Sequence, residues 1–283
     1  MNIKRLFMHI MIFLNILVSN CSDNNIIVIA DTHGDINRFK YILKDAGVLD
    51  NHYKWIAPSN TTVIQLGDQI DPKPIDKHDI YDKHHFKMIY FTNYLETEAK
   101  SKNSSFISMI GNHEHMNIDR IRNKSDLKNI IAQRPIIRKI DNYIFCHGSL
   151  KMIHYERLNQ YKWTLDDINS LWTRFVMNES LTDTDSELLD LLIVGNNSII
   201  YTKNADNKQN ISTILDTYNV DYMIVGHLIT KHIHLKNRIW YLDQLLKRAF
   251  DDNIYNYIQI INGDIKIKTL KNYMVQNIFL SIF

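Results

Sequence analysis

Cysteine, proline and glycine are all scarce in this sequence. Only two cysteines occur in 283 residues, which excludes a disulfide-stapled scaffold. Four prolines and eight glycines leave no Pro/Gly-rich linker, and no internal repeat or low-complexity stretch is present, so one large domain is expected. The formal net charge is +2, with acidic and basic residues interspersed, which gives no sign of a nucleic-acid-binding surface.

Long apolar runs are also missing, except near the N-terminus. Lys4 and Arg5 precede an apolar run over residues 6–18, which is short for a membrane-spanning helix. A basic head, a run of this length and the small residue Ser19 nearby are typical of a secretory signal peptide.

We therefore predict a signal peptide or N-terminal anchor over residues 1–21 and one folded domain over residues 22–283. A lipid-modified Cys21 and an ordinary core helix are the alternatives. The first interpretation predicts a secretory, extracellular or membrane-anchored protein, with membrane association through residues 1–21 only. If these residues are not a targeting segment, the protein is expected in the cytoplasm.

Five strand-like apolar runs end in histidine or aspartate. The runs and their ends are Ile26–Ala30 before Asp31 and His33, Thr62–Leu66 before Asp68, Ser105–Ile110 before Gly111-Asn112-His113-Glu114, Tyr143–Cys146 before His147, and Asp221–Val225 before His227. One such ending could be an ordinary polar loop. Five of them predict strand ends that meet in one place, because open α/β sheets place ligands at the carboxyl ends of their strands.

The remaining elements surround these strands. Apolar periodicity and helix-breaking residues predict helices at residues 36–46, 76–100, 126–133, 165–177 and 208–218. A hairpin is predicted around Asp141-Asn142. Strands that alternate with helices early, and hairpins late, favour a mixed sheet covered by helices.

In order, the five strand ends carry D-x-H-G, G-D-x-x-D, G-N-H-E, H-G and G-H. This series resembles the metal-dependent phosphoesterase superfamily, and within it the phosphoprotein phosphatase, or calcineurin-like, branch, over residues from about 25 to about 250. The resemblance implies an α/β (mixed α+β) fold in which two packed mixed β-sheets are flanked by helices, a four-layer sandwich with its site at the strand ends.

The same resemblance implies a site for two divalent metal ions. Its ligands would be Asp31, His33 and Asp68 for one ion, and Asp68, Asn112, His147 and His227 for the other. Asp68 would bridge the two. Two ions so placed acidify a bridging water into a nucleophilic hydroxide for in-line attack on phosphorus. Nitrogen and oxygen donors without a thiolate suit Mn, Fe or Zn.

His113 and Asp71 are the predicted catalytic residues. By resemblance, Asp71 orients the imidazole of His113, which then protonates the leaving oxygen as a general acid. Glu114 matches a family position that is usually structural, and we expect no catalytic role for it.

The sequence departs from the family pattern at a phosphate-binding position. Pro72-Lys73 follows Asp71, where members with the fullest motif have arginine, and lysine does not reproduce the bidentate fork of a guanidinium. Arg174, in Leu171-Trp-Thr-Arg174, is the predicted substitute, since this segment resembles the bacterial-type (Shewanella-like) phosphatases. The alternative for Arg174 is an exposed helix residue.

These features predict a metal-dependent phosphomonoesterase that acts on phosphorylated protein or peptide. A nucleotide or diadenosine-polyphosphate hydrolase is the alternative within the same chemistry. A catalytically weak, metal-binding scaffold is the alternative from another class, and the lost arginine is its only support.

Overall fold

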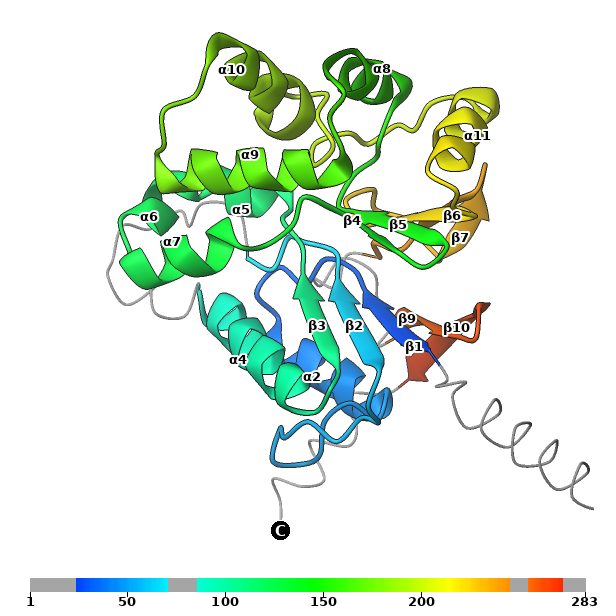
Figure 1. Ribbon diagram of the computed structural model, residues 1–283. Helices are drawn as coiled ribbons and strands as arrows, with labels where there is room; N and C mark the ends of the chain where they lie inside the picture. Colours follow the sequence, from blue (N-terminus) through cyan, green and yellow to red (C-terminus); the bar gives the residue numbers. More distant parts are fainter. Residues whose placement is uncertain (1–23, 71–85, 245–253, 272–283) are drawn as a thin grey trace, which may run out of the picture.

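The computed structural model describes residues 24–70, 86–244 and 254–271, which form two five-stranded sheets flanked by helices (Figure 1). The first sheet has the order β10-β9-β1-β2-β3 and the second the order β4-β5-β6-β8-β7. Their bounds are β1 Asn25–Ile29, β2 Thr61–Gln65, β3 Ser105–Ser108, β4 Ile137–Ile140, β5 Tyr143–Cys146, β6 Tyr222–Val225, β7 His234–Lys236, β8 Ile239–Tyr241, β9 Ile254–Ile261 and β10 Asp264–Lys271.

Both sheets are mixed. In the first sheet, β1, β2 and β3 are parallel, and the β9–β10 hairpin adds antiparallel to β1. In the second, β5, β6 and β8 are parallel, with β4 and β7 antiparallel at the two edges. The carboxyl ends of β1, β2 and β3 therefore lie along one edge of their sheet, and those of β5 and β6 along one edge of theirs.

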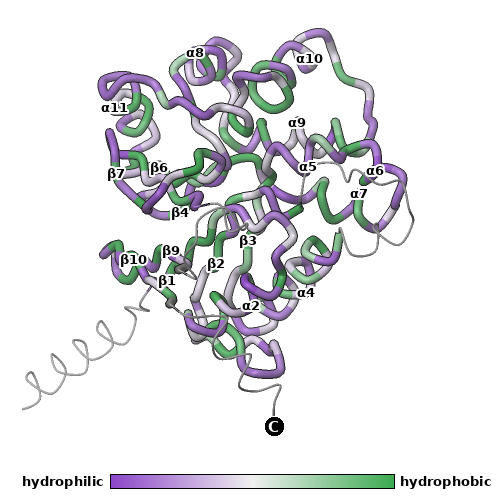
Figure 2. Tube along the Cα trace, turned by 180° about the vertical axis from the view of Figure 1, so that it is seen from behind, coloured by the Kyte–Doolittle hydropathy of each residue, from purple (hydrophilic) through white to green (hydrophobic). Residues whose placement is uncertain are grey.

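Alternation along each strand builds three apolar layers. In β1, Ile26 and Val28 pack against the second sheet, with Phe145 and Ile224, while Ile27 faces the helices on the outside. Because side chains alternate between the two faces of a strand, a strand buried on both faces is apolar throughout. Figure 2 shows these hydrophobic stretches where the sheets face each other.

Helices cover both outer faces of the sandwich (Figure 1). On the first sheet lie α2 Ile36–Asp45 and α4 Lys87–Ser101, which share an apolar cluster with it. The larger cluster on the second sheet gathers α6 Ile118–Arg122, α7 Ser125–Ala132, α8 Met152–Tyr161, α9 Leu165–Met177, α10 Asp183–Leu189, the π-helix η1 Asp190–Val194 and α11 Lys208–Thr217. The short helix α5 Asn112–Met116 follows β3. The predicted four-layer sandwich is confirmed.

The predicted helices agree with the structure to within a residue or two at most ends. The hairpin is β4–β5, and Asp141 turns it with a φ of 49°. The helix predicted over residues 76–100 is seen as α4, whose described part begins at Lys87; residues 76–85 of that prediction lie outside the described residues.

Several predictions fall on residues that the structure does not describe. These are the signal peptide or anchor over residues 1–21, the catalytic residue Asp71, and the Pro72-Lys73 departure. Within the ranges that are described, no helix is both long and apolar enough to cross a membrane.

Candidate active site

The five predicted strand ends meet at one place. At its buried floor, His147 Nε2 lies 3.3 Å from Asp68 Oδ1 and 3.0 Å from Asn112 Oδ1. His147 Nδ1 lies 3.9 Å from Asp31 Oδ1. Four chain segments, following β1, β2, β3 and β5, thus contribute to one polar cluster inside an apolar sandwich.

Three histidines form the more open side of this cluster. His33 Nε2 lies 3.9 Å from Asp31 Oδ2, and His113 Nε2 lies 3.6 Å from Asp68 Oδ2. The His33 and His113 rings are 4.7 Å apart between centroids. His33, His113 and His227 are half-buried, whereas the carboxylates beneath them are buried, so a substrate would approach from the histidine side.

The donor atoms fall into two groups that share Asp68. His33, Asp68 and His113 form one group, and Asp68, His147 and His227 the other, with the ligand atoms of each group within 4.8 Å of one another. A carboxylate that belongs to both groups fits a bridging ligand. One difference from the sequence prediction concerns His113, whose Nε2 is as close to the first group as a ligand would be.

Three residues of the cluster have a left-handed backbone conformation. His33, Asp68 and His227 have φ angles of 45°, 50° and 58°, a left-handed conformation that costs non-glycine residues about 1–3 kcal/mol each. Gly111 and Gly226 serve a different purpose, since a Cβ would lie 2.2 Å from Asp68 Oδ1 at the former and 2.3 Å from Asp31 Oδ1 at the latter. These glycines let the backbone approach the two carboxylates.

Glu114 holds the Asp68 loop to α5. Its buried carboxylate accepts hydrogen bonds from the backbone N–H groups of Asp68 at 2.9 Å, Gln69 at 2.8 Å, Ile70 at 3.3 Å and Gly111 at 2.8 Å. Burial and the nearby Asp68 raise the pKa of Glu114, and the hydrogen bond from the Gly111 N–H acts against that rise. The contacts are those of a structural group, as the sequence predicted.

Replacing Glu114 with glutamine should destabilise the protein. The amide NH₂ would face backbone donors, leaving at least one buried N–H without an acceptor, so we expect Glu114→Gln to lower the free energy of unfolding by about 1–3 kcal/mol. Urea denaturation followed by circular dichroism measures this. The exposed Glu179→Gln is the control, expected to stay within about 0.5 kcal/mol of wild type. Equal stability of the two variants would show that the hydrogen bonds of the Glu114 carboxylate do not stabilise the fold.

Backbone carbonyls orient the imidazoles. Leu66 O lies 2.9 Å from His147 Nδ1, and Ile70 O lies 3.0 Å from His113 Nδ1, so in each ring the N–H at Nδ1 donates outward and Nε2 is left facing the cluster. His227 is reversed, because its Nε2 lies 3.1 Å from Tyr201 O and Nδ1 is the atom left for a ligand role.

Charge and burial shift the pKa values of the cluster in opposite directions. Burial alone would lower the pKa of His147, but the Asp68 and Asp31 carboxylates raise it to about 10. Burial raises the pKa of Asp68, yet the neighbouring imidazoles hold it below the usual range. Burial and then Asp243 raise the pKa of Asp31, while burial and His147 lower the pKa of His227 to about 4. Carboxylates and imidazoles packed this tightly fit a site that receives cations.

Arg174 is not brought to the cluster by any described contact. It lies on α9, with Nη2 2.6 Å from Asp185 Oδ2, and its side chain is about one-third exposed. The predicted phosphate-binding role therefore stays a prediction.

Tyr201 is the neighbour that sequence reasoning missed. Besides holding His227 through its carbonyl, it places its hydroxyl 2.9 Å from Nδ1 of His115, on the same short helix as Asn112. In the sequence, Tyr201 simply follows two isoleucines, and no motif there indicates contact with His227 or His115. His154, given no role by the sequence, is a satisfied core histidine bonded to Asn197 O at 2.9 Å.

A two-sheet sandwich with Asp, Asn and His side chains at its strand ends is the architecture of metal-dependent phosphoesterases. The sequence pattern of the calcineurin-like phosphoesterase family matches residues 25–230, and the chain belongs to this family.

Two curated relatives refine this placement. Shewanella-like protein phosphatase 1 of Plasmodium berghei is 27% identical over 241 residues, which cover 72% of this chain and 61% of that protein. Shewanella-like protein phosphatase 2 of Arabidopsis thaliana is 33% identical over 94 residues, covering 33% of this chain and 22% of that protein. The chain spans less than two thirds of the length of either relative. The predicted resemblance to the Shewanella-like branch is confirmed.

Solved structures share the fold. The cold-active protein-tyrosine phosphatase of a psychrophilic Shewanella species has a TM-score of 0.68 at 17% identity, covering 88% of this chain and 80% of that one. A protein serine/threonine phosphatase from Saccharomyces cerevisiae has a TM-score of 0.54 at 16% identity, covering 89% and 82%. At these identities the likeness establishes the fold alone.

Proposed function

We propose that this protein is a metal-dependent phosphomonoesterase that hydrolyses phosphorylated protein or peptide. The observation that carries the proposal is the pair of ligand groups that share Asp68. Their imidazole and carboxylate donors, with the Asn112 amide that contacts His147, suit Mn, Fe or Zn, since no thiolate is among them. When bound, two such ions would acidify a water nucleophile and neutralise phosphate charge.

The protein's own groups supply the remaining steps. Asp68 and His147 form the buried floor of the site, where they would hold the metal ions that face the phosphate. His113 stands at the open side, held by Ile70 O at Nδ1 and by a backbone N–H bond to Asp68 Oδ1 at 2.9 Å. Its Nε2 is directed to the cluster, where it could pass a proton to the leaving oxygen.

Phosphoprotein is the favoured substrate class because the curated relatives are named protein phosphatases. Nucleotides and dinucleoside polyphosphates would suit the same chemistry. A scaffold without turnover would retain the fold and metals, and its only support is the arginine lost after Asp71. Among the described residues, the predicted ligands Asp31 and Asn112 fall outside the two groups but contact their member His147.

The purified chain, assayed with added Mn, Fe or Zn, tests this proposal. We expect turnover of phosphoserine, phosphothreonine or phosphotyrosine peptides that exceeds turnover of AMP, ATP and diadenosine tetraphosphate. A preference for the nucleotides would show that the substrates are nucleotides rather than phosphoproteins, while metal-dependent phosphoester hydrolysis would still hold. Stoichiometric metal without turnover of any ester would instead support the scaffold.

A further inference from the structure

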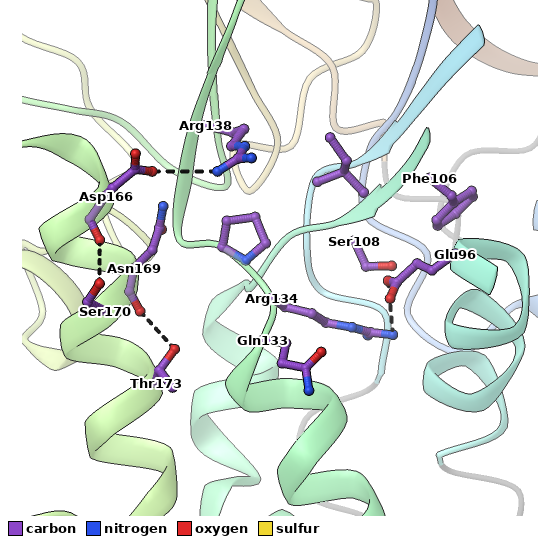
Figure 3. A pocket seen from close by; sticks show the side chains of 12 residues that line it. Glu96, Phe106, Ser108, Gln133, Arg134, Arg138, Asp166, Asn169, Ser170 and Thr173 are labelled. Carbon is purple, nitrogen blue, oxygen red and sulfur yellow. Dashed lines mark hydrogen bonds and ion pairs between the residues drawn. The ribbon is translucent and has the colours of Figure 1, made fainter. Parts of the chain in front are cut away.

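A pocket of about 390 Å³ opens between β3, α4, the end of α7 and α9 (Figure 3). None of its lining residues belongs to the Asp/His cluster. Two ion pairs line the pocket, Arg134 with Glu96 and Arg138 with Asp166. The volume lies in the range of small-molecule sites.

The Arg134 guanidinium is buried but incompletely neutralised. Its side chain is 2% exposed, and it donates to three neutral acceptors, Gln69 Oε1 at 2.8 Å, Thr92 Oγ1 at 2.9 Å and Ile89 O at 3.1 Å. Glu96 Oε1 lies 3.6 Å from Nη2, longer than the 2.7–2.9 Å or so of a charge-assisted hydrogen bond. Arg134 Nε has no hydrogen-bond partner among the described residues. A buried cation in this state favours a closer anion.

Ser108 adds unused donors beside Arg134. Its hydroxyl is buried, and within the described part of the chain it has no hydrogen-bond partner. Successive residues of β3 alternate, since Met109 N–H points inward to Gln65 O and Ile110 N–H points outward to Pro135 O. By the same alternation, the N–H of Ser108 points outward, to the side where the pocket lies.

Arg138, on β4, provides a second cation that is easier to reach. Its side chain is about half exposed, and its partner Asp166 lies 3.5 Å away and is mostly exposed. Such surface pairs contribute little to stability, so Arg138 can exchange Asp166 for another anion.

We propose that this pocket binds a ligand that carries two carboxylates, one at Arg134 and Ser108 and the other at Arg138. Glu96 is only partly buried, so its carboxylate can turn to solvent and leave its place beside Arg134 to the ligand. The shared chemistry is the dicarboxylate, whether it comes from a small metabolite or from two acidic side chains of a protein segment. This site is separate from the proposed phosphatase chemistry and does not depend on it.

Titration calorimetry with the full chain tests the proposal. The probes are a dicarboxylate series from succinate to pimelate and the blocked peptide acetyl-Asp-Gly-Asp-amide. We expect saturable binding with a Kd below about 1 mM for at least one probe. Tighter binding of a free dicarboxylate points to a metabolite, and tighter binding of the peptide points to a protein segment. No saturable binding by any probe overturns the proposal.

Two pairs of variants locate the binding, and none removes Arg134, whose loss could unfold the chain. Glu96→Gln should tighten binding about tenfold, because it removes the competing carboxylate, whereas Glu98→Gln on the same helix should change nothing. Arg138→Gln should weaken binding about tenfold, while Arg157→Gln, at a partly exposed arginine on α8 that pairs with Glu187, should not. Binding that ignores both Glu96→Gln and Arg138→Gln occurs elsewhere, for example at bound metal, and also overturns the proposal.

Discussion

Asp68→Asn is expected to abolish metal binding and turnover together. The carboxylate of Asp68 is the group common to both sets of ligand atoms, and an amide offers one oxygen and no charge where two oxygens of an anion are needed. Metal content should fall from two ions per chain to one or none, and phosphatase activity to background. Elemental analysis of the dialysed protein and steady-state turnover measure both effects.

The control for this variant is Asp183→Asn, which neutralises an exposed carboxylate in the first turn of α10. It should retain full metal and activity. Two bound ions and wild-type turnover in Asp68→Asn would show that Asp68 does not bridge.

His113→Asn should lower kcat by about 10²–10⁴-fold on a phosphoserine peptide, if general acid catalysis contributes its usual share. The metal content should stay at the wild-type level, because the sequence assigns His113 to proton transfer. The loss should depend on the leaving group. p-Nitrophenyl phosphate releases a stable anion that needs little protonation, so its kcat should fall much less.

Two further variants separate the roles around His113. Asp71→Asn should show the same leaving-group dependence in weaker form, since it would alter only the orientation and charge of the imidazole. Arg174→Ala should weaken both substrates alike, because a phosphate clamp does not sense the leaving group. Equal losses on the two esters, or loss of metal, in His113→Asn would rule out the general acid and favour a ligand role, which its 3.6 Å distance to Asp68 also permits.

The site was predictable because its residues follow strands. An apolar run that ends directly, or after a glycine, in aspartate, asparagine or histidine can be recognised in the sequence alone. Parallel strands bring such ends to a common edge of a sheet. This pattern predicts that one set of residues lies together, and the structure brings them together: Asp31, His33, Asp68, Asn112, His113, His147 and His227.

Contacts between distant, irregular segments were not predictable. Tyr201 reaches His227 from the loop after η1, and Arg134 reaches Gln69 from a position 65 residues later in the chain. Asn169 likewise closes the outer edge of β4 by accepting from the N–H groups of Ile136 and Ile137. These partners belong to no periodic pattern, since each depends on how helices pack on the sandwich.

The tether made by Glu114 has a mechanical consequence for the site. Because one carboxylate clasps the loop after β2 and the start of α5, Asn112 and His113 cannot shift without carrying Asp68 with them. A thermal displacement of α5 against the first sheet should therefore move Asn112, His113 and Asp68 together. Distances between residues inside the site should fluctuate less than distances from the site to the surrounding helices. The side chains of the site should then keep their relative positions while the helices around them move.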